Sequence, residues 1–165
     1  MIRQAREADA QQILNLSKQL SAETDFMLRE VGEENLSIKD QESILYDFSN
    51  STNKVFIVAE IDGVIVGFCV GIGSTARRNQ HNLYCVVGIL HAFTGQGLGR
   101  KLLVSLEAWA QNVGFTRLEL TVMLHNKIAR ALYLSLGFEE EGIKRQSLKI
   151  DGNFVDEVYM SKLLA

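Results

Sequence analysis

A glycine-rich junction between a strand and a helix, residues 90–104 (LHAFTGQGLGRKLLV), constrains the fold of this 165-residue chain most strongly. Gly95, Gly97 and Gly99 permit backbone angles that side chains forbid, and they let a ligand approach the main chain closely. Apolar residues then recur at helical spacing, at Leu98, Leu102, Leu103, Leu106, Trp109 and Val113. The segment therefore predicts a glycine-rich loop that leads directly into an amphipathic helix.

The start of this helix has the chemistry of an anion site. The first backbone N–H groups of a helix lack internal partners and carry a partial positive charge, so they bind phosphates readily. Arg100 and Lys101 lie in the first turn, where each cation opposes the helix dipole by about 0.3–1 kcal/mol. A bound polyphosphate would convert that repulsion into attraction. On these residues alone, a glycine-rich turn with two solvated cations is nearly as good an interpretation.

Two common phosphate-binding motifs fit this loop poorly. A Walker A loop places Lys-Ser/Thr after its last glycine, whereas Arg100-Lys101-Leu102 stands here. A dinucleotide-binding loop has the pattern G-x-G-x-x-G, whereas this chain has G-x-G-x-G. Glu119 follows Gly99 by 20 residues, near the spacing of a ribose-binding acid, but it lies inside a strand-like run. A nucleotide-dependent oxidoreductase is therefore a weak alternative.

A third motif is the acetyl-CoA loop Q/R-x-x-G-x-G/A of the GCN5-related N-acetyltransferase (GNAT) family. Residues 94–99 resemble it at every position except the first, where Thr94 replaces Gln or Arg. The resemblance continues through N-x-x-A-x-x-L-Y-x-x-x-G-F at residues 126–138, and the tail from residue 141 to 160 is similar to the bacterial branch of the family. The similarity is strong from about Val55 onward and weak before it.

The resemblance implies a GNAT-like α/β fold with helices on both faces of a mixed, mostly antiparallel sheet. This sheet has about seven strands and is splayed between the fourth and the fifth. Periodicity by itself indicates only an α+β chain with one β-α-β unit. The expected strands are residues 2–6, 55–61, 64–71, 83–90, 116–123, 138–148 and 153–161, and the expected helices are 9–21, 38–49, 98–113 and 127–136.

Local signals predict several element ends. Asp62-Gly63 and Asp151-Gly152 predict tight turns between strands. Ser37 is the expected N-cap of the second helix, and Gly114 is expected to end the third.

Length and composition limit the other function classes. Residues 1–165 suit one domain, here a single N-acetyltransferase domain. A net charge of −3 argues against a nucleic-acid-binding surface, and the longest apolar runs are too short to span a membrane. The N-terminus lacks a secretory signal pattern, which favours the cytoplasm. Cys69 and Cys85 lie in apolar runs and are expected to be buried reduced thiols rather than a disulfide.

The resemblance assigns acetyl-CoA as co-substrate, without a metal ion, and implies where this carrier binds. The fourth expected strand, at Val87, Gly88 and Ile89, would pair its backbone with pantetheine beside the thioester carbonyl. Gly88 inside a strand predicts a bulge or a close approach, although a glycine packed against a helix explains it about as well. The pyrophosphate is expected at Gly95, Gln96, Gly97, Leu98, Gly99 and Arg100.

Asn126 and Tyr133 are the remaining site candidates, seven residues apart and hence on one helix face. Asn126 is an expected helix N-cap that would also reach the splayed gap and contact the cofactor. An aromatic residue at helical spacing is usually part of the core, but the resemblance places Tyr133 near the CoA sulfur. A phenol with a pKa of about 10 stays protonated at neutral pH and can donate to a departing thiolate. Tyr133 is therefore the expected catalytic acid.

The sequence identifies no general base. Many family members carry a glutamate on the fourth or fifth strand near the amine, and these positions here hold Tyr84 and Thr121. Glu119 shares a sheet face with Thr121 but is more simply an exposed residue, and a water relay to backbone carbonyls serves equally well. His125 is the only histidine near the expected centre. Covalent catalysis by Cys85 would need an activator that the sequence does not identify.

The expected function is direct transfer of the acetyl group of acetyl-CoA to a primary amine, of a small molecule or a peptide, in a ternary complex. An acyl-CoA sensor without turnover is the alternative, because the usual acids are missing. Residues 1–50 hold ten acidic against five basic residues, and the acids crowd the loop at residues 22–34, at Glu23, Asp25, Glu30, Glu33 and Glu34. These acids favour a cationic acceptor between this loop and the turn near residues 149–153, although any one of them is more often simply part of a solvated surface. The oligomeric state stays open, a homodimer included.

Overall fold

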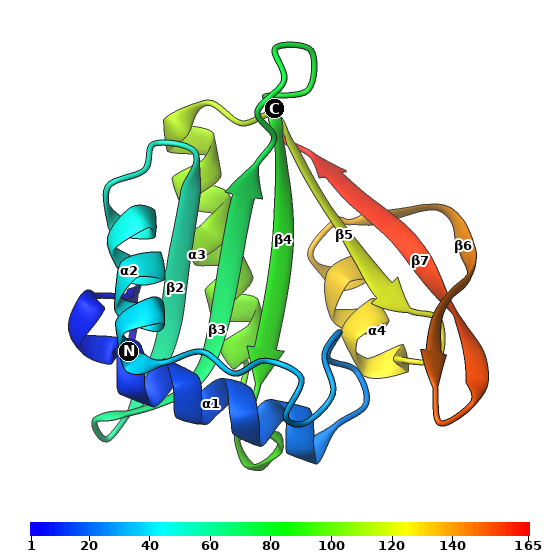
Figure 1. Cartoon of the computed structure of the whole chain (residues 1–165). Helices are drawn as coiled ribbons and strands as arrows, with labels where there is room; N and C mark the ends of the chain where they lie inside the picture. Colours follow the sequence, from blue (N-terminus) through cyan, green and yellow to red (C-terminus); the bar gives the residue numbers. More distant parts are fainter.

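The computed structural model describes residues 1–165, in which one seven-stranded sheet carries four α-helices (Figure 1). The strands are β1 (Ile2–Gln4), β2 (Lys54–Ile61), β3 (Val64–Gly73), β4 (Asn82–Ile89), β5 (Arg117–Met123), β6 (Glu139–Ile150) and β7 (Asn153–Leu163). The helices are α1 (Ala10–Glu23), α2 (Ile38–Ser49), α3 (Leu98–Val113) and α4 (Lys127–Ser135), with short 3-10 turns at Glu7–Asp9 and His91–Phe93. Every expected strand and helix is present in the expected order, whereas the two 3-10 turns were not predicted.

The sheet has the strand order β1-β2-β3-β4-β5-β7-β6. All neighbouring strands run antiparallel except β4 and β5, which are parallel and are connected through α3. The predicted turns at Asp62-Gly63 and Asp151-Gly152 have positive φ at both residues, the backbone form of a tight hairpin turn. The mixed, mostly antiparallel sheet expected from the family resemblance is confirmed.

The β4 and β5 strands separate after only three paired residues. The last pair is Tyr84 with Glu119. Beyond it, β4 stays paired with β3 as far as Ile89, and β5 stays paired with β7 as far as Met123. The two strands therefore diverge like the arms of a V, as Figure 1 shows. This confirms the predicted splay and leaves one side of each arm without a strand partner.

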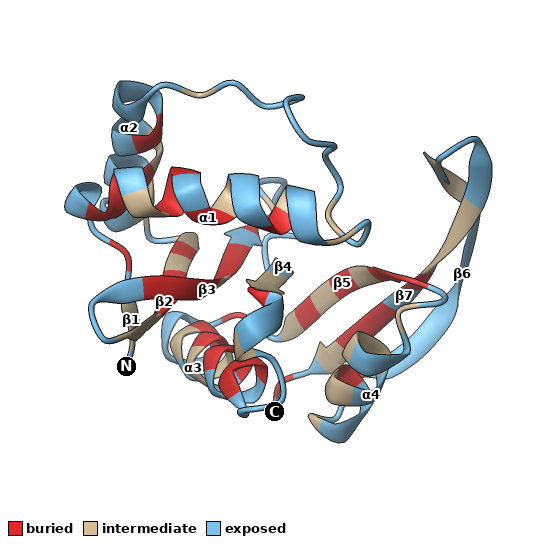
Figure 2. Cartoon of the chain, turned by 90° about the horizontal axis from the view of Figure 1, so that it is seen from below, coloured by how far each residue is buried: buried red, intermediate tan, exposed pale blue.

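The helices form two layers around the sheet. In Figure 2, α1 and α2 lie on one side, here called the α1 face, and α3 and α4 lie on the other. No helix covers the α1 face of β5 and β7. The buried core fills the space between the layers and includes Leu45, Val58, Leu102, Leu106, Leu118 and Val158. The helices thus leave open the α1 face on one arm of the V.

Local capping interactions define the first or last residue of three helices, as the sequence predicts. Ser37 caps α2, because its Oγ accepts a hydrogen bond from the Asp40 amide at 3.1 Å. Gly114 ends α3 with a φ of 112°. Asn126 caps α4, since its Oδ1 accepts a hydrogen bond from the Ala129 amide at 3.3 Å.

None of the helices combines the length and the apolar character needed to cross a membrane. No group of three or more His, Cys, Asp or Glu side chains is placed to hold a metal ion.

Candidate active site

The glycine-rich loop presents unpaired backbone donors to open space. Gly95 and Gly97 have φ values of 77° and 81°, and apart from the adjoining chain no atom lies within 4 Å of the position that a Cβ would occupy on either residue. The first α3 hydrogen bond runs from the Lys101 amide to the Gly97 carbonyl at 3.1 Å. The amides of residues 98–100 therefore have no partner within the helix, and no side chain caps it. This arrangement suits a pyrophosphate.

Two hydrogen bonds hold the N-terminal side of this loop. Thr94, the mismatch to the family motif, donates its hydroxyl to the His91 carbonyl at 2.7 Å. The His91 amide donates to Oε1 of Glu23 at 2.9 Å. Glu23, one of the predicted acceptor-side acids, therefore ties the end of α1 to the turn before the loop.

Gly99 brings together the three elements that carry the predicted cofactor residues. A Cβ on this glycine would lie 2.9 Å from Leu132 Cδ2 of α4 and 3.3 Å from Ile89 Cδ1 of β4. Arg100 adds a second contact to α4, because its Nη2 donates to Ser135 Oγ at 2.7 Å. The end of β4, the start of α3 and the face of α4 beside Tyr133 are thus in direct contact.

The β4 edge that faces the gap offers backbone groups to a ligand. The Leu90 amide donates to the Val66 carbonyl at 2.9 Å, toward the β3 side. Because backbone directions alternate along a strand, the amides and carbonyls of Val87 and Ile89 point to the opposite side. The strand has no partner there. An extended chain such as pantetheine can therefore pair with this edge.

Gly88 faces the α1 side and is tightly enclosed. A Cβ at this position would lie 2.7 Å from Phe68 Cε1 and 3.1 Å from Leu20 Cδ1 of α1. The β3–β4 register is continuous through Gly88, so the predicted bulge is wrong. The glycine is needed because α1 and the Phe68 ring pack closely against the strand.

Tyr133 is a buried residue whose hydroxyl still reaches solvent. Its side chain lies against Phe138, with 5.7 Å between the ring centroids, and burial raises its pKa above the ordinary value. The Tyr133 hydroxyl makes no hydrogen bond within the chain. The buried polar atoms that lack both a partner and contact with solvent are Asn82 Oδ1 and Arg130 Nε, so the Tyr133 hydroxyl is in contact with solvent. The phenol therefore stays protonated and remains accessible. These are the two properties that a proton donor needs.

Tyr84 and Thr121 meet at the apex of the V. Their hydroxyl groups lie 3.1 Å apart, within hydrogen-bond distance. Glu119, the other acid considered near the centre, is ion-paired with Arg117 at 3.0 Å. The hydroxyls of Tyr84 and Thr121 thus occupy the apex, and the nearby acid already has a cationic partner.

The loop that joins α1 to α2 reaches across to the second arm. Its Phe26 ring lies against His125, with 5.1 Å between the centroids, beside the N-cap of α4. This contact places the loop next to the uncovered α1 face of β5. Sequence reasoning considered His125 as a reactive group and did not predict this aromatic contact.

Several acids of this loop are engaged by the chain itself. Arg29 lies 3.8 Å from Glu33 and 3.5 Å from Glu34. Asp25 and Glu30 form no ion pair, and the single cation Arg29 offsets only one of the charges of Glu33 and Glu34, so the loop keeps a net negative charge.

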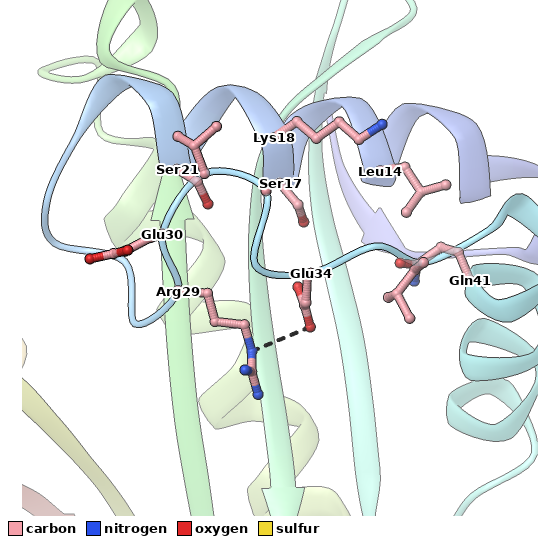
Figure 3. A pocket seen from close by; sticks show the side chains of 11 residues that line it. Leu14, Ser17, Lys18, Ser21, Arg29, Glu30, Glu34 and Gln41 are labelled. Carbon is pink, nitrogen blue, oxygen red and sulfur yellow. Dashed lines mark ion pairs between the residues drawn. The ribbon is translucent and has the colours of Figure 1, made fainter.

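A small pocket lies between α1, this loop and α2 (Figure 3). Ser17 and Ser21 of α1 point toward the loop, and Arg29 and Glu34 form their ion pair at its edge. Its volume of about 70 Å³ is far below that of pockets that enclose cofactors. None of the predicted cofactor residues lines it. The pocket is therefore separate from the gap between β4 and β5.

Burial makes Cys85 a poor nucleophile. Both cysteines are free and buried, and burial raises the pKa of Cys85 to about 12. Because the thiolate is the reactive form, we expect iodoacetamide at pH 8 to leave folded Cys85 unmodified and Cys85→Ala to keep its kcat within about twofold. Mass spectrometry and steady-state kinetics measure the two effects. An acetylated Cys85 trapped during turnover would contradict this expectation.

The mixed sheet and the gap between β4 and β5 are the features expected of an N-acetyltransferase, and a comparison with protein families gives the same class. Residues 20–138 match the Acetyltransferase (GNAT) family. The chain belongs to this family, which confirms the resemblance seen in its motifs.

Particular relatives extend this result. The chain is 32% identical to the N-alpha-acetyltransferase RimI of Mycobacterium tuberculosis over 104 residues, which is 62% of this chain and 63%, less than two thirds, of RimI. It is 36% identical over 124 residues to the 5-NmdU N-acetyltransferase of Pseudomonas phage PaMx11, covering 70% of this chain and 85% of the phage protein. A GNAT-family acetyltransferase from Streptococcus pneumoniae superimposes with a TM-score of 0.96 at 31% identity over 99% of both chains.

Proposed function

We propose that this protein transfers the acetyl group of acetyl-CoA directly to a primary amine within a ternary complex. The separation of β4 from β5, next to an uncapped glycine-led helix start, carries the proposal. A sheet that only needed stability would gain by pairing these strands along their whole length. The opening instead exposes backbone groups on β4 at the place where the α3 amides are also unpaired.

The cofactor would extend from the gap to the start of α3. Its pantetheine arm pairs with the edge at Val87 and Ile89, and its pyrophosphate accepts hydrogen bonds from the amides of residues 95–100. Asn126 uses Oδ1 to cap α4, so its Nδ2 remains a donor for the cofactor. Arg100 and Lys101 add positive charge beside the phosphates.

The chemical step would take place at the β4 side of the gap. The amine nitrogen attacks the thioester carbonyl carbon, so a C–N bond forms and the C–S bond breaks. Tyr133 gives its phenolic proton to the departing thiolate and regains a proton from water, and the amine proton passes to water, since Tyr84 and Thr121 offer hydroxyl groups and no carboxylate. Unpaired β4 amides stabilise the negative charge on the carbonyl oxygen.

Two measurements test this proposal. Native mass spectrometry detects acetyl-CoA on the protein, and thiol release with a panel of amines detects turnover. Binding together with amine-dependent release of CoA supports the proposal. Binding without release from any amine would instead indicate a sensor, and absence of binding would refute both functions.

The acceptor is proposed to be cationic, because Asp25 and Glu30 add uncompensated negative charge beside the open α1 face. We expect kcat/KM for such an amine to fall as ionic strength rises to the physiological range, since screening acts over about 8–10 Å. The double variant Asp25→Lys, Glu30→Lys should also lower kcat/KM at low salt. Glu42→Lys with Asp47→Lys, an equal charge change on exposed positions of α2, is the matched control. Equal effects of the two variants, or a salt-independent rate, would contradict the expectation.

A further inference from the structure

Glu157 of β7 is an acid on the open α1 face that the proposed mechanism does not use. It pairs with Met123 of β5, and its neighbour on the same face, Tyr159, pairs with Thr121. Residues two apart in a strand share a face, so Glu157 lies on the surface that also carries the Tyr84–Thr121 hydroxyl pair. No helix covers this surface (Figure 2).

The chain orients this carboxylate but engages only one of its oxygens. The Glu157 side chain is 12% exposed, and its Oε1 accepts a hydrogen bond from Ser147 Oγ at 2.8 Å. Lys144 Nζ lies 3.9 Å from the same oxygen, on a half-exposed side chain, so this ion pair is weak. Oε2 makes no hydrogen bond within the chain and is not among the polar atoms sealed from solvent. A largely buried carboxylate with a free oxygen is a site for a cationic group.

Glu157 lies on β7, away from the β4 edge that would hold the thioester. Neighbouring strands lie about 4.8 Å apart, and β7 is one strand beyond β5. Because β5 has already separated from β4 at this level, β7 is at least about 10 Å from the β4 edge. An amine that attacks a carbonyl held on β4 lies at the first arm of the V, whereas Glu157 projects from the second arm.

We infer that Glu157 binds a second cationic group of the acceptor, several bonds from the amine that receives the acetyl group. This inference rests on the proposed function and specifies its substrate class. Such an acceptor is either a free diamine or a peptide amino group followed by a lysine or arginine side chain. In both cases the shared chemistry is two cationic groups separated by a flexible spacer.

Two matched sets of acceptors test the wild-type protein. The first set is 1,5-diaminopentane, pentylamine and 5-aminopentanoate, which share a five-carbon chain and differ in the far group. We expect kcat/KM to be about tenfold higher for the diamine than for pentylamine, and lowest for the carboxylate. The second set is the peptides Ala-Lys-Ala, Ala-Met-Ala and Ala-Glu-Ala, with the same order expected. The set with the higher kcat/KM identifies the source of the second cation.

Substitutions then assign the preference to Glu157. In Glu157→Gln the side chain still accepts the Ser147 hydrogen bond but carries no charge. The difference of about tenfold in kcat/KM between the diamine and pentylamine should therefore disappear. Turnover of pentylamine and KM for acetyl-CoA should not change. Lys144→Ala removes the competing cation and should lower KM for the dication. Glu140→Gln, which removes an acid of β6 paired with Arg130 at 2.6 Å, is the matched control and should keep the preference.

The outcomes separate this inference from the proposed function. If the wild-type protein acetylates no amine, the proposed function fails. If kcat/KM is the same for pentylamine and for the diamine, the inference is overturned and the proposed function stands. The same holds if folded Glu157→Gln keeps the higher kcat/KM for the diamine. Thermal melting shows whether Glu157→Gln is folded. If that variant unfolds, the wild-type order of acceptors, with the Lys144→Ala effect, decides.

Discussion

Replacing Gly97 with valine is expected to weaken acetyl-CoA binding by at least about 100-fold while the protein remains folded. The Cβ position of Gly97 faces open space next to the unpaired α3 amides, where the proposal places the pyrophosphate. A branched side chain there keeps the phosphate oxygens away from these amides. Isothermal titration calorimetry measures the affinity, and thermal melting measures the stability.

The control for this variant has to account for backbone strain. Gly97 has a φ of 81°, and forcing an L-residue into this region costs roughly 1–2 kcal/mol. Gly63, in the turn between β2 and β3, has a φ of 79° and an equally open Cβ position. Gly63→Val should therefore lose similar stability but retain acetyl-CoA binding. An unchanged Kd in folded Gly97→Val would place the pyrophosphate elsewhere.

Tyr133→Phe is expected to lower kcat by about 10²- to 10⁴-fold, the usual contribution of a positioned acid, with little change in acetyl-CoA affinity. The change removes only the hydroxyl, and the ring keeps its contact with Phe138. Because the hydroxyl makes no hydrogen bond within the chain, the fold should lose little stability. Tyr46→Phe, at an exposed position of α2, is the control.

The pH dependence adds an independent test of Tyr133. An acid catalyst acts in its protonated form, and burial raises the pKa of Tyr133 above its ordinary value. The acid form therefore persists to higher pH than for an exposed phenol, and kcat should not fall through loss of this proton below about pH 10. Full turnover by Tyr133→Phe would show that solvent supplies the proton.

Local sequence signals predicted most of the elements and several of their ends. Ser37 and Asn126 cap helices because a short polar side chain can satisfy an amide three residues on. The positive φ of Gly114 follows from its place at the C-terminal end of α3. Local signals do not predict the splay between β4 and β5, because hydrophobic periodicity carries no information on strand separation. Only the family resemblance implied it.

Features that depend on distant contacts were not predictable in this way. For Gly88 the sequence leaves a bulge and packing against a helix about equally open, and the contacts with Leu20 and Phe68, which are far away in sequence, decide for packing. The importance of Glu157 depends on the neighbours of β7 in the sheet, and the sequence alone does not define strand order. The roles of Tyr133 and of the cofactor residues remain predictions.

The short parallel contact between β4 and β5 divides the sheet into two panels, β1 to β4 and β5 to β7, which have different proposed roles. Only three residue pairs join the panels. The proposed carrier contacts of a strand edge and a helix start belong to the first panel, whereas Thr121, Glu157 and Tyr159 belong to the second. On the proposed function, substitutions of these three outward residues would change which amine is accepted and leave the backbone contacts of β4 and α3 with the carrier in place. A chain built in this way can acquire new acceptors by changing a few outward side chains.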